Sequence, residues 1–366
     1  MRVHLVDPSA FTPPYDHALA AALARAGEDV ELVTSRFLYG PVPREDGYRV
    51  SERFYRRTAQ RGLEARGRTA LKLAEHVPDM LRYRRHAAEA DVVHWQWLTV
   101  QPLDVRLLPR GRPQVLTAHD VIPREPRTGQ LAATRRLVNQ MDAVIAHSEH
   151  GAGRLRDELG LPAERVRVIP HGAFDYLTRL PDERPLPDEL AAVEGPVVLF
   201  FGLLRPYKGI DVLLEAFRQV HGAELWIVGM PRMPIEPLRA AAGPNVRFVP
   251  RFITDPEIPA YFRRADAVVL PYREIDQSGV LYTALAFGKP MVLSDVGGFG
   301  EVAEHGAARL VPPGQPEALA GALTELLGNK GERDRLSSAA AEAAAGPYSW
   351  DRIAEQTIAL YRDLLP

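Results

Sequence analysis

The chain has 366 residues, 46% hydrophobic and 25% charged, enough apolar material for one or two sizeable cores, which excludes a disordered tail protein. Lys and Arg total 45 against 47 Asp and Glu, a balance that excludes the overall basic footprint of a nucleic-acid binder. Cysteine is absent, which excludes disulfides and thiolate metal sites. With no apolar run of about 18 residues, we expect a cytoplasmic protein.

Short apolar runs of strand length alternate with helical patterns in the first half of the chain, as buried parallel strands typically do. The runs expected to be strands are residues 3–6, 30–34, 92–94, 115–118, 143–146 and 166–170. Residues 18–26 predict the first crossover helix, ended by Gly27. This alternation predicts an α/β, doubly wound sheet.

A second series of apolar runs follows, again with helical patterns after most of them. Its members are residues 197–201, 224–228, 246–249, 267–270, 291–293 and 308–311. Two sheets of about six strands each are therefore expected.

Residues 173–195 carry three prolines among acidic residues, which is typical of an exposed connector. We therefore expect an N-terminal domain at 1–172, a linker at 173–195 and a C-terminal domain at 196–348. The pattern of 349–366 predicts an amphipathic helix that packs back across the junction. Two Rossmann-like domains so joined are expected to face each other across a cleft at the carboxyl ends of their strands.

The turn after the run at 197–201 places two cations before a helix. Gly202 leaves the strand, Arg205 and Lys208 follow, and Asp211 stands where it can cap the helix. Helix-start amides beside two cations suit a diphosphate. The alternative is a pair of solvated surface cations.

A second candidate anion site follows the run at 267–270. The polar loop 271–278 opens a helix of small residues that Gly288 ends, and the amides around 278–280 can bind an anion. Residues 297–300 then form a Gly-Gly-x-Gly turn, which by itself most often marks only a turn.

In this order and spacing, the segments resemble the retaining GT-B glycosyltransferases of glycosyltransferase family 4. That family carries a strand-Gly-x-x-x-x-x-Lys-Gly turn, a loop and helix ending in Gly-x-Pro, and a Gly-Gly-x-x-Glu in its second domain. The resemblance extends to first-domain segments 91–95, 117–120, 143–148 and 168–172. It implies hexosyl transfer, with retained anomeric configuration, from a UDP- or GDP-linked sugar to a glycan, lipid-linked or small-molecule acceptor.

The resemblance implies that the second domain holds the donor. Charge on the departing diphosphate grows in the transition state, so Arg205 and Lys208 are expected to act there. The residues implied in donor binding are Gly202, Arg205, Lys208, Arg251, Phe252, Gln277, Ser278, Gly279, Val280 and Thr283. No cofactor and no metal is expected, and the chain lacks the Asp-x-Asp motif of many metal-dependent transferases.

The family's paired glutamates, eight residues apart, are not reproduced. Ile275 stands at the first position and Thr283 at the second, with Glu274 one residue early. We expect Glu274 to act in catalysis in place of the first glutamate.

In the first domain the resemblance places His119 beside the donor sugar, where it orients the sugar or stabilises the developing oxocarbenium ion. The alternative is a histidine that caps a strand end. Acceptor contacts are expected from Tyr15, Asp16, His94 and Trp95. The alternative for the tryptophan is core packing, and the alternative for the first loop, which contains Tyr15 and Asp16, is a rigid proline turn. The family's early glycine pair is missing from that loop.

From residue 49 to residue 85, eleven Lys or Arg stand against four acids, with leucines between them. Such a segment docks on anionic lipid or binds an anionic acceptor, which would make the protein peripheral at the inner face of a membrane. A solvated helical face is the alternative.

Two other functions fit the same architecture. A sugar-nucleotide epimerase would turn over the donor without an acceptor. A non-catalytic protein that binds sugar nucleotides would bind the donor without any slow hydrolysis.

Overall fold

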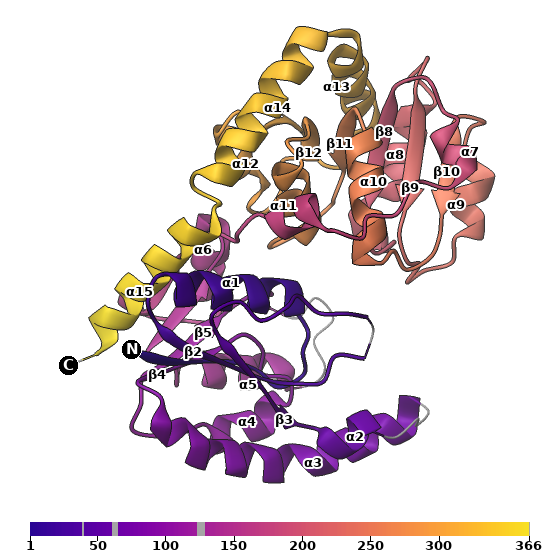
Figure 1. Cartoon of the computed structure of the whole chain (residues 1–366). Helices are drawn as coiled ribbons and strands as arrows, with labels where there is room; N and C mark the ends of the chain where they lie inside the picture. Colours follow the sequence, from indigo (N-terminus) through magenta and orange to yellow (C-terminus); the bar gives the residue numbers. More distant parts are fainter. Residues whose placement is uncertain (39, 61–64, 123–128, 366) are drawn as a thin grey trace. The chain divides into compact units, whose positions relative to one another are not determined.

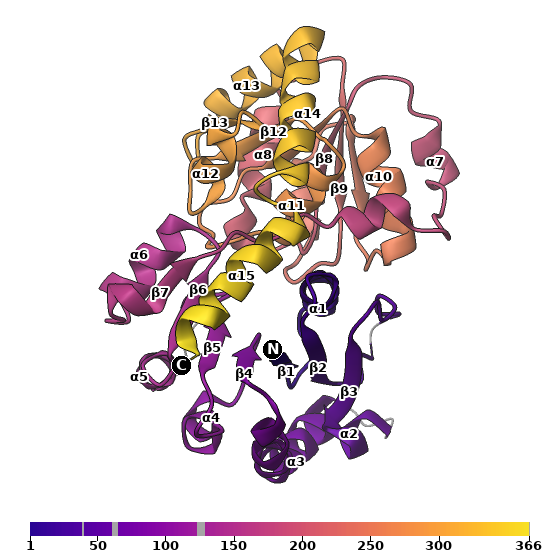
Figure 2. The same ribbon diagram turned by 60° about the vertical axis from the view of Figure 1, so that its left-hand side comes forward.

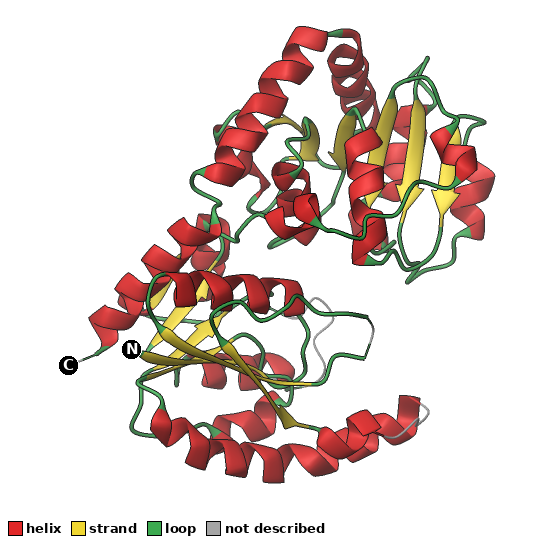
Figure 3. Cartoon of the chain, viewed as in Figure 1, coloured by secondary structure: helices red, strands yellow, loops and turns green. Residues whose placement is uncertain are grey.

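The structure of the chain is a computed structural model that describes residues 1–38, 40–60, 65–122 and 129–365. Contacts divide the chain into two compact units, unit 1 (Met1–His171 and Trp350–Pro366) and unit 2 (Gly172–Ser349). Figure 3 shows that each unit is a sheet flanked by helices. Among the described residues, no helix combines the length and the apolar character needed to cross a bilayer.

Unit 1 is built on a seven-stranded parallel sheet of order β3-β2-β1-β4-β5-β6-β7. Its strands are β1 (Arg2–Asp7), β2 (Asp29–Ser35), β3 (Arg49–Phe54), β4 (Val92–Trp95), β5 (Gln114–Thr117), β6 (Ala143–Ala146) and β7 (Val166–Val168). The six strands predicted for this half are confirmed. The seventh, β3, was not predicted, because it lies at the sheet edge, is mostly exposed and therefore has no apolar run.

The helices of unit 1 cover both faces of this sheet. They are α1 (Pro13–Arg25), α2 (Arg56–Gln60), α3 (Ala65–His86), α4 (Gln101–Leu107), α5 (Gln130–Val138), α6 (Glu149–Asp157) and α15 (Trp350–Leu364). α1 and α3 lie on opposite faces (Figure 1). α1 begins earlier than predicted because Pro13 and Pro14 are well tolerated in a first helical turn.

The C-terminal helix α15 belongs to unit 1 and packs beside α1 (Figure 2). Ile353 and Tyr361 of α15 are fully buried, and Arg25 of α1 donates to the Asp351 carboxylate at 2.8 Å. The last segment of the chain thus completes the core of the first unit.

Unit 2 has a six-stranded parallel sheet of order β10-β9-β8-β11-β12-β13. Its strands are β8 (Val197–Phe201), β9 (Glu224–Val228), β10 (Val246–Val249), β11 (Ala267–Leu270), β12 (Met291–Ser294) and β13 (Ala308–Val311). All six were predicted, because β8, β9, β11 and β12 are apolar and almost wholly buried.

The helices of unit 2 are α7 (Asp188–Ala191), α8 (Ile210–Phe217), α9 (Glu236–Ala241), α10 (Ile258–Arg264), α11 (Gly279–Ala286), α12 (Phe299–Glu304), α13 (Pro316–Gly328) and α14 (Lys330–Ala345). Contacts group the segment 173–195, expected as an exposed connector, with this unit, and residues 181–185 of it are exposed. Ala173, Leu177 and Leu190 are buried there, so these apolar side chains hold the segment against the unit despite its prolines.

Candidate functional site

Each sheet has one point at which its strand order reverses, and doubly wound sheets bind ligands outside the carboxyl ends of the strands at that point. The reversal lies between β1 and β4 in unit 1 and between β8 and β11 in unit 2. In unit 2, all of the predicted site residues except Arg251 and Phe252 follow β8 or β11.

The turn after β8 carries a buried cation beside a glycine. Gly202 leaves the strand with φ of +106°, and a Cβ placed on it would lie only 3.1 Å from Lys208 Nζ. Lys208 is 6% exposed, and its Nζ lies 4.8 Å from the centre of the Tyr272 ring. Arg205 is exposed. One predicted cation is therefore held in place by the protein, whereas the other points to solvent.

Gly209 joins this turn to the loop after β11. Its φ is +65°, and a Cβ at this position would overlap the Pro271 carbonyl oxygen. Arg273 strengthens the contact by donating to the Pro206 carbonyl at 2.9 Å and to both Asp211 carboxylate oxygens at 2.9 and 2.6 Å. Asp211 was expected to cap α8, but the N-cap position is occupied by Gly209. Asp211 lies in the first turn, where the bonds from Arg273 lower the pKa of its carboxyl.

The loop after β11 leads to a helix start that can receive an anion. α11 begins at Gly279, and its N-cap residue Ser278 makes no side-chain capping bond. The Gln277 side chain accepts a hydrogen bond from the Tyr282 hydroxyl at 2.7 Å, and Ser278 Oγ lies 3.4 Å from the Tyr272 hydroxyl. Because these side chains are tied to the protein, the backbone amides of the first turn are the groups suited to bind an anion.

The side chain of Val280, the next residue of α11, lies against the turn after β8, since its Cγ2 would be 3.0 Å from a Cβ on Gly202. Thr283 is buried, and its hydroxyl donates to the Gly279 carbonyl at 3.0 Å. Glu274 is exposed. The Thr283 hydroxyl proton is thus used within the helix, while the role of Glu274 stays a prediction.

The third glycine turn serves packing. Gly297 has a φ of +55°, and a Cβ on it would overlap the Ile275 carbonyl oxygen. The turn after β12 therefore packs against the loop after β11, and a side chain at Gly297 would displace that loop.

Arg251 and Phe252 follow β10, two strands away from the reversal point. Arg251 donates to the Glu257 carboxylate at 2.6 Å. Burial alone would raise the pKa of Glu257, but this hydrogen bond helps to lower it to about 2. The Phe252 side chain is 52% exposed. This pair thus follows a different strand from the turns after β8 and β11, and the exposed ring of Phe252 leaves a stacking surface.

In unit 1, the loop after β1 is gathered around one carboxylate. Asp7 accepts hydrogen bonds from the backbone N–H groups of Ser9 at 3.0 Å, Phe11 at 2.5 Å and Thr12 at 3.3 Å. Asp16, expected to contact the acceptor, is buried, and its Oδ1 accepts from the Thr12 hydroxyl at 3.2 Å. Burial raises the pKa of both carboxyls. We therefore correct the assignment of Asp16, which shapes the loop instead.

Tyr15, also expected to contact the acceptor, is 2% exposed. Its ring lies among four others, with centroid distances of 4.7 Å to His119, 5.4 Å to His147, 4.9 Å to His171 and 5.1 Å to Trp350. Tyr15 thus packs against the His119 ring at right angles and supports it, rather than contacting a ligand.

His94 and Trp95 belong to the core of unit 1, which corrects their expected place beside the acceptor. Both are fully buried. His94 forms hydrogen bonds with the Tyr361 hydroxyl at 2.6 Å and the Thr117 hydroxyl at 2.7 Å, and Trp95 donates to the Gln114 side chain at 2.8 Å. A strand that is covered on both faces buries its polar side chains as well as its apolar ones. A histidine in such a strand therefore does not indicate a binding surface.

His119 follows β5 and ends a chain of hydrogen bonds. His147 Nδ1 lies 3.1 Å from the Ile169 carbonyl, His147 Nε2 lies 3.3 Å from His119 Nδ1, and His119 Nε2 lies 3.1 Å from Gln96 Oε1. The Gln96 amide nitrogen has no partner within the described part of the chain. If the Gln96 side-chain amide is rotated by 180°, its N–H donates to the lone pair on His119 Nε2. Each hydrogen bond of this chain then has one donor and one acceptor while both imidazole rings are neutral.

Both histidines are neutral at pH 7. Burial lowers the pKa of His147 to about 4, and it lowers the pKa of His119 well below the ordinary value, with further lowering by the neighbouring histidines. The Trp97 ring is stacked on His119 at 5.2 Å. A neutral imidazole can stabilise positive charge that develops beside it, which a cationic ring would oppose.

A further cation, outside the sequence motifs, lies at the same edge of unit 1. Lys72 of α3 stands over the Tyr55 ring at 4.6 Å and 5.8 Å from the ring of Phe11. Phe11 is 57% exposed and contacts Trp97 edge-on at 5.4 Å. Lys72 was counted only as one charge of the basic segment, because its partner Tyr55 follows β3, the strand that was not predicted.

The basic segment is therefore not a single helical face. It comprises β3, α2 and α3, while residues 61–64 lie outside the described part and nothing is described of the side chains of Arg66 and Arg68. Arg53 pairs with Glu31 at 3.5 Å, and Arg82 pairs with Asp79. Arg56 and Arg57 are exposed, and α3 also exposes Leu73 and Leu81.

Family comparisons cover both units. Residues 15–173 match the family described as "Glycosyltransferase Family 4", and residues 195–329 match the family described as "Glycosyl transferases group 1". The chain is 30% identical over 307 residues to the D-inositol 3-phosphate glycosyltransferase of Acidothermus cellulolyticus, over 75% of this chain and 67% of the relative.

The same named activity belongs to a relative from Jonesia denitrificans, which is 30% identical over 258 residues, or 65% of this chain. That alignment spans only 60% of the relative's own length. Among solved structures, sucrose-phosphate synthase from Thermosynechococcus elongatus is similar with a TM-score of 0.77 and 22% identity, covering 100% of this chain and 99% of the other. This similarity confirms the GT-B fold.

Proposed function

The chain belongs to glycosyltransferase family 4, and from this premise we propose that it transfers a hexosyl unit from a nucleotide-diphosphate sugar to a hydroxyl group of an acceptor. The observation that carries the proposal is the buried Lys208 ammonium, held beside Gly202 at the carboxyl end of β8. A buried cation next to a helix start is suited to a diphosphate, whose negative charge increases as the sugar leaves.

The donor diphosphate is proposed to lie against both turns of unit 2. Lys208 supplies a fixed charge, Arg205 folds in from solvent, and the α11 amides at Gly279 and Val280 donate to phosphate oxygens. These cations do the work that a bridging metal does in other transferases, which supports metal-independent transfer. UDP and GDP are the proposed leaving groups, with Phe252 as a stacking surface for the base.

The proposed reaction retains anomeric configuration. The acceptor oxygen forms a bond to the anomeric carbon on the face from which the diphosphate departs, and the bond from that carbon to the phosphate oxygen breaks. The acceptor hydroxyl proton passes to the departing phosphate oxygen. His119, kept neutral by its surroundings, stabilises the oxocarbenium character of the sugar, and Glu274 is proposed to contact a sugar hydroxyl.

The acceptor is proposed to be a small polyhydroxylated molecule with an anionic group. Lys72, with the exposed ring of Phe11 beside it, provides a charge and a flat surface at the edge of unit 1. Two relatives whose names include D-inositol 3-phosphate support an acceptor of this class. Lys72→Ala should raise KM for a phosphorylated acceptor and leave KM for the donor unchanged.

A peripheral membrane contact is a further part of the proposal, supported by exposed Arg56 and Arg57 and by Leu73 and Leu81 on α3. Each basic residue near an anionic surface is worth about 1 kcal/mol. Replacing both arginines by glutamate should therefore weaken sedimentation with anionic liposomes at low salt, and wild-type protein that ignores such liposomes would exclude this contact.

The test is a thermal-shift screen of nucleotide sugars, followed by turnover with candidate acceptors. A donor at about 100 times its Kd should add about 2.7 kcal/mol to the free energy of unfolding. NMR of the product should show retained configuration, and EDTA should leave the rate unchanged. Conversion of the donor without an acceptor would indicate an epimerase, and binding with neither transfer nor hydrolysis would indicate a non-catalytic protein.

A further inference from the structure

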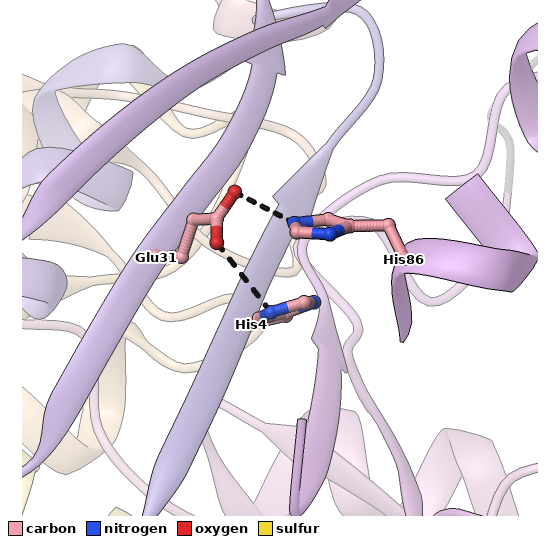
Figure 4. A group of neighbouring side chains, drawn as sticks. All are labelled: His4, Glu31 and His86. Atoms are coloured by element: carbon pink, nitrogen blue, oxygen red, sulfur yellow. Dashed lines mark hydrogen bonds and ion pairs between the residues drawn. The ribbon is translucent and has the colours of Figure 1, made fainter. Parts of the chain in front are cut away.

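Three side chains that the proposed reaction does not use converge on one face of the unit 1 sheet. His4 of β1 and Glu31 of β2 are direct partners in the strand register, so both point to the same face. His86, the last residue of α3, reaches the same point from the helix that covers this face. Figure 4 shows the two histidine rings stacked on the same side of Glu31, each with a nitrogen directed at one oxygen of its carboxylate.

The three side chains lie close enough together to share one small cation, although His86 and Glu31 are joined by a direct hydrogen bond here. His86 Nε2 lies 2.8 Å from Glu31 Oε1, and His4 Nε2 lies 3.6 Å from Glu31 Oε2. All three ligand atoms fall within 4.8 Å of one another. Ligands about 2.0–2.1 Å from a tetrahedral zinc ion stand some 3.3 Å apart, so small rotations of these side chains suffice.

His4 directs an unsatisfied atom into this point. The side chain is 0% exposed, and within the described part of the chain its Nε2 has no hydrogen-bond partner. Its other nitrogen, Nδ1, lies 3.4 Å from the Tyr83 hydroxyl. If Nδ1–H donates to Tyr83, then Nε2 presents a buried lone pair to a carboxylate, an arrangement that costs free energy unless a cation lies between them.

His86 has an outer partner of the kind found around bound metals. Its Nδ1 lies 3.4 Å from the Glu89 carboxylate. A histidine that donates one ring N–H to a carboxylate presents a lone pair on the other nitrogen, which is the tautomer that binds a metal. When a metal displaces the Nε2 proton of His86, Glu89 is placed to receive the N–H at Nδ1.

We propose that His4, Glu31 and His86 form a binding site for a divalent transition metal of the zinc type. Two imidazoles and one carboxylate suit Zn²⁺, Co²⁺ or Ni²⁺ rather than Mg²⁺ or Ca²⁺, which prefer oxygen ligands. Three protein ligands leave one coordination position for water. The site binds metal in competition with Arg53, whose Nε lies 3.5 Å from Glu31 Oε1 but whose side chain is 42% exposed and free to move away.

The proposed site is structural rather than catalytic. His4 stands three residues before Asp7, about 10 Å along β1 from the loops at the carboxyl end of the sheet. A metal there would join β1, β2 and the end of α3, and would therefore stabilise unit 1 without touching the proposed substrates.

The experiment uses full-length protein without a histidine tag, because a tag would bind the probe. After treatment with EDTA and titration with Zn²⁺, elemental analysis should show one tightly bound zinc per chain, and Co²⁺ in its place should give the visible absorption of a four-coordinate ion. Glu31→Gln and His86→Ala should each weaken Zn²⁺ binding by more than the roughly 10–100-fold that loss of an outer partner costs.

His221→Ala is the matched control, since it removes an exposed histidine of unit 2 and should leave Zn²⁺ affinity unchanged. Arg53→Ala should tighten Zn²⁺ binding by up to about fivefold, the worth of an exposed ion pair, which keeps the test valid if a ligand variant folds poorly. Zinc binding equal in wild type, His86→Ala and Glu31→Gln, or no binding by wild type and Arg53→Ala, would overturn the proposal.

Discussion

The two units differ in the titratable side chains that they bury, and the distribution of histidines shows this difference. Of the eleven histidines, all within the described residues, nine lie in unit 1 and only His221 and His305 lie in unit 2. All six buried histidines belong to unit 1. Unit 2 instead surrounds one buried lysine, Lys208, with glycine turns and an apolar core. Fixed charge suits a diphosphate that is always anionic, whereas neutral imidazoles suit a centre where positive charge develops only during reaction.

The difference also explains what the sequence could predict. In unit 2 the strands β8 and β11 are continuous apolar runs, and Arg205 and Lys208 lie within seven residues of the end of β8, so local patterns predicted both the fold and the turns. In unit 1 the polar network joins distant parts of the chain: His94 and Tyr361, which form a hydrogen bond, are 267 residues apart. No local pattern reports such a contact, and the buried strand positions of His94 and Trp95 therefore looked like a binding surface.

The largest effect is expected for a substitution at Gly209, which tests the contact between the two turns of unit 2 through the free energy of unfolding. Gly209→Ala should lower the free energy of unfolding of this unit by about 3 kcal/mol, because a left-handed residue costs roughly 1–2 kcal/mol and overlap with a packed carbonyl about as much again. Hydrogen exchange of the β8 and β11 amides measures it. Gly222→Ala is the control: its φ is +73°, but nothing lies within 4 Å of the new Cβ. Equal effects at the two positions would contradict the assigned contact with Pro271.

Removing the fixed charge should nearly abolish function. Lys208→Ala is expected to lower kcat/KM by about 100-fold or more, the loss of a charge-assisted contact that strengthens in the transition state. Initial rates with donor and acceptor measure it. Lys330→Ala removes an exposed lysine of the same unit and should have no effect. Normal turnover in Lys208→Ala would remove the donor from this turn.

In unit 1, His119→Ala should lower kcat by roughly 10–100-fold, less than the roughly 100–10,000-fold typical of a positioned acid or base, because the neutral ring transfers no proton in the proposed reaction. The neutral ring is proposed to assist the sugar rather than the nucleotide, so KM for the donor should change little. His150→Ala, at an exposed histidine of the same unit, is the control. A loss confined to KM would show that His119 binds ground states only.

The pH dependence of stability offers a smaller test of unit 1. Burial lowers the pKa of His94 to about 3, against about 6.5 in an unfolded chain. Between those values the unfolded state binds a proton that the folded state does not, so stability is full above about pH 6.5 and is lost as the pH falls. His94→Gln should reduce this slope by up to about 1.4 kcal/mol per pH unit between pH 4 and 6. Chemical denaturation at several pH values measures it, and an unchanged slope would show that His94 titrates alike in both states.

The most direct test of the division between the units is calorimetric titration of the free nucleoside diphosphate of the active donor into three proteins. Wild type and His119→Ala should bind it with the same affinity, because His119 is assigned to the sugar. Lys208→Ala should bind at least about tenfold more weakly, which corresponds to about 1.4 kcal/mol of lost charge-assisted contact. Equal weakening in both variants, or full affinity in Lys208→Ala, would contradict the account.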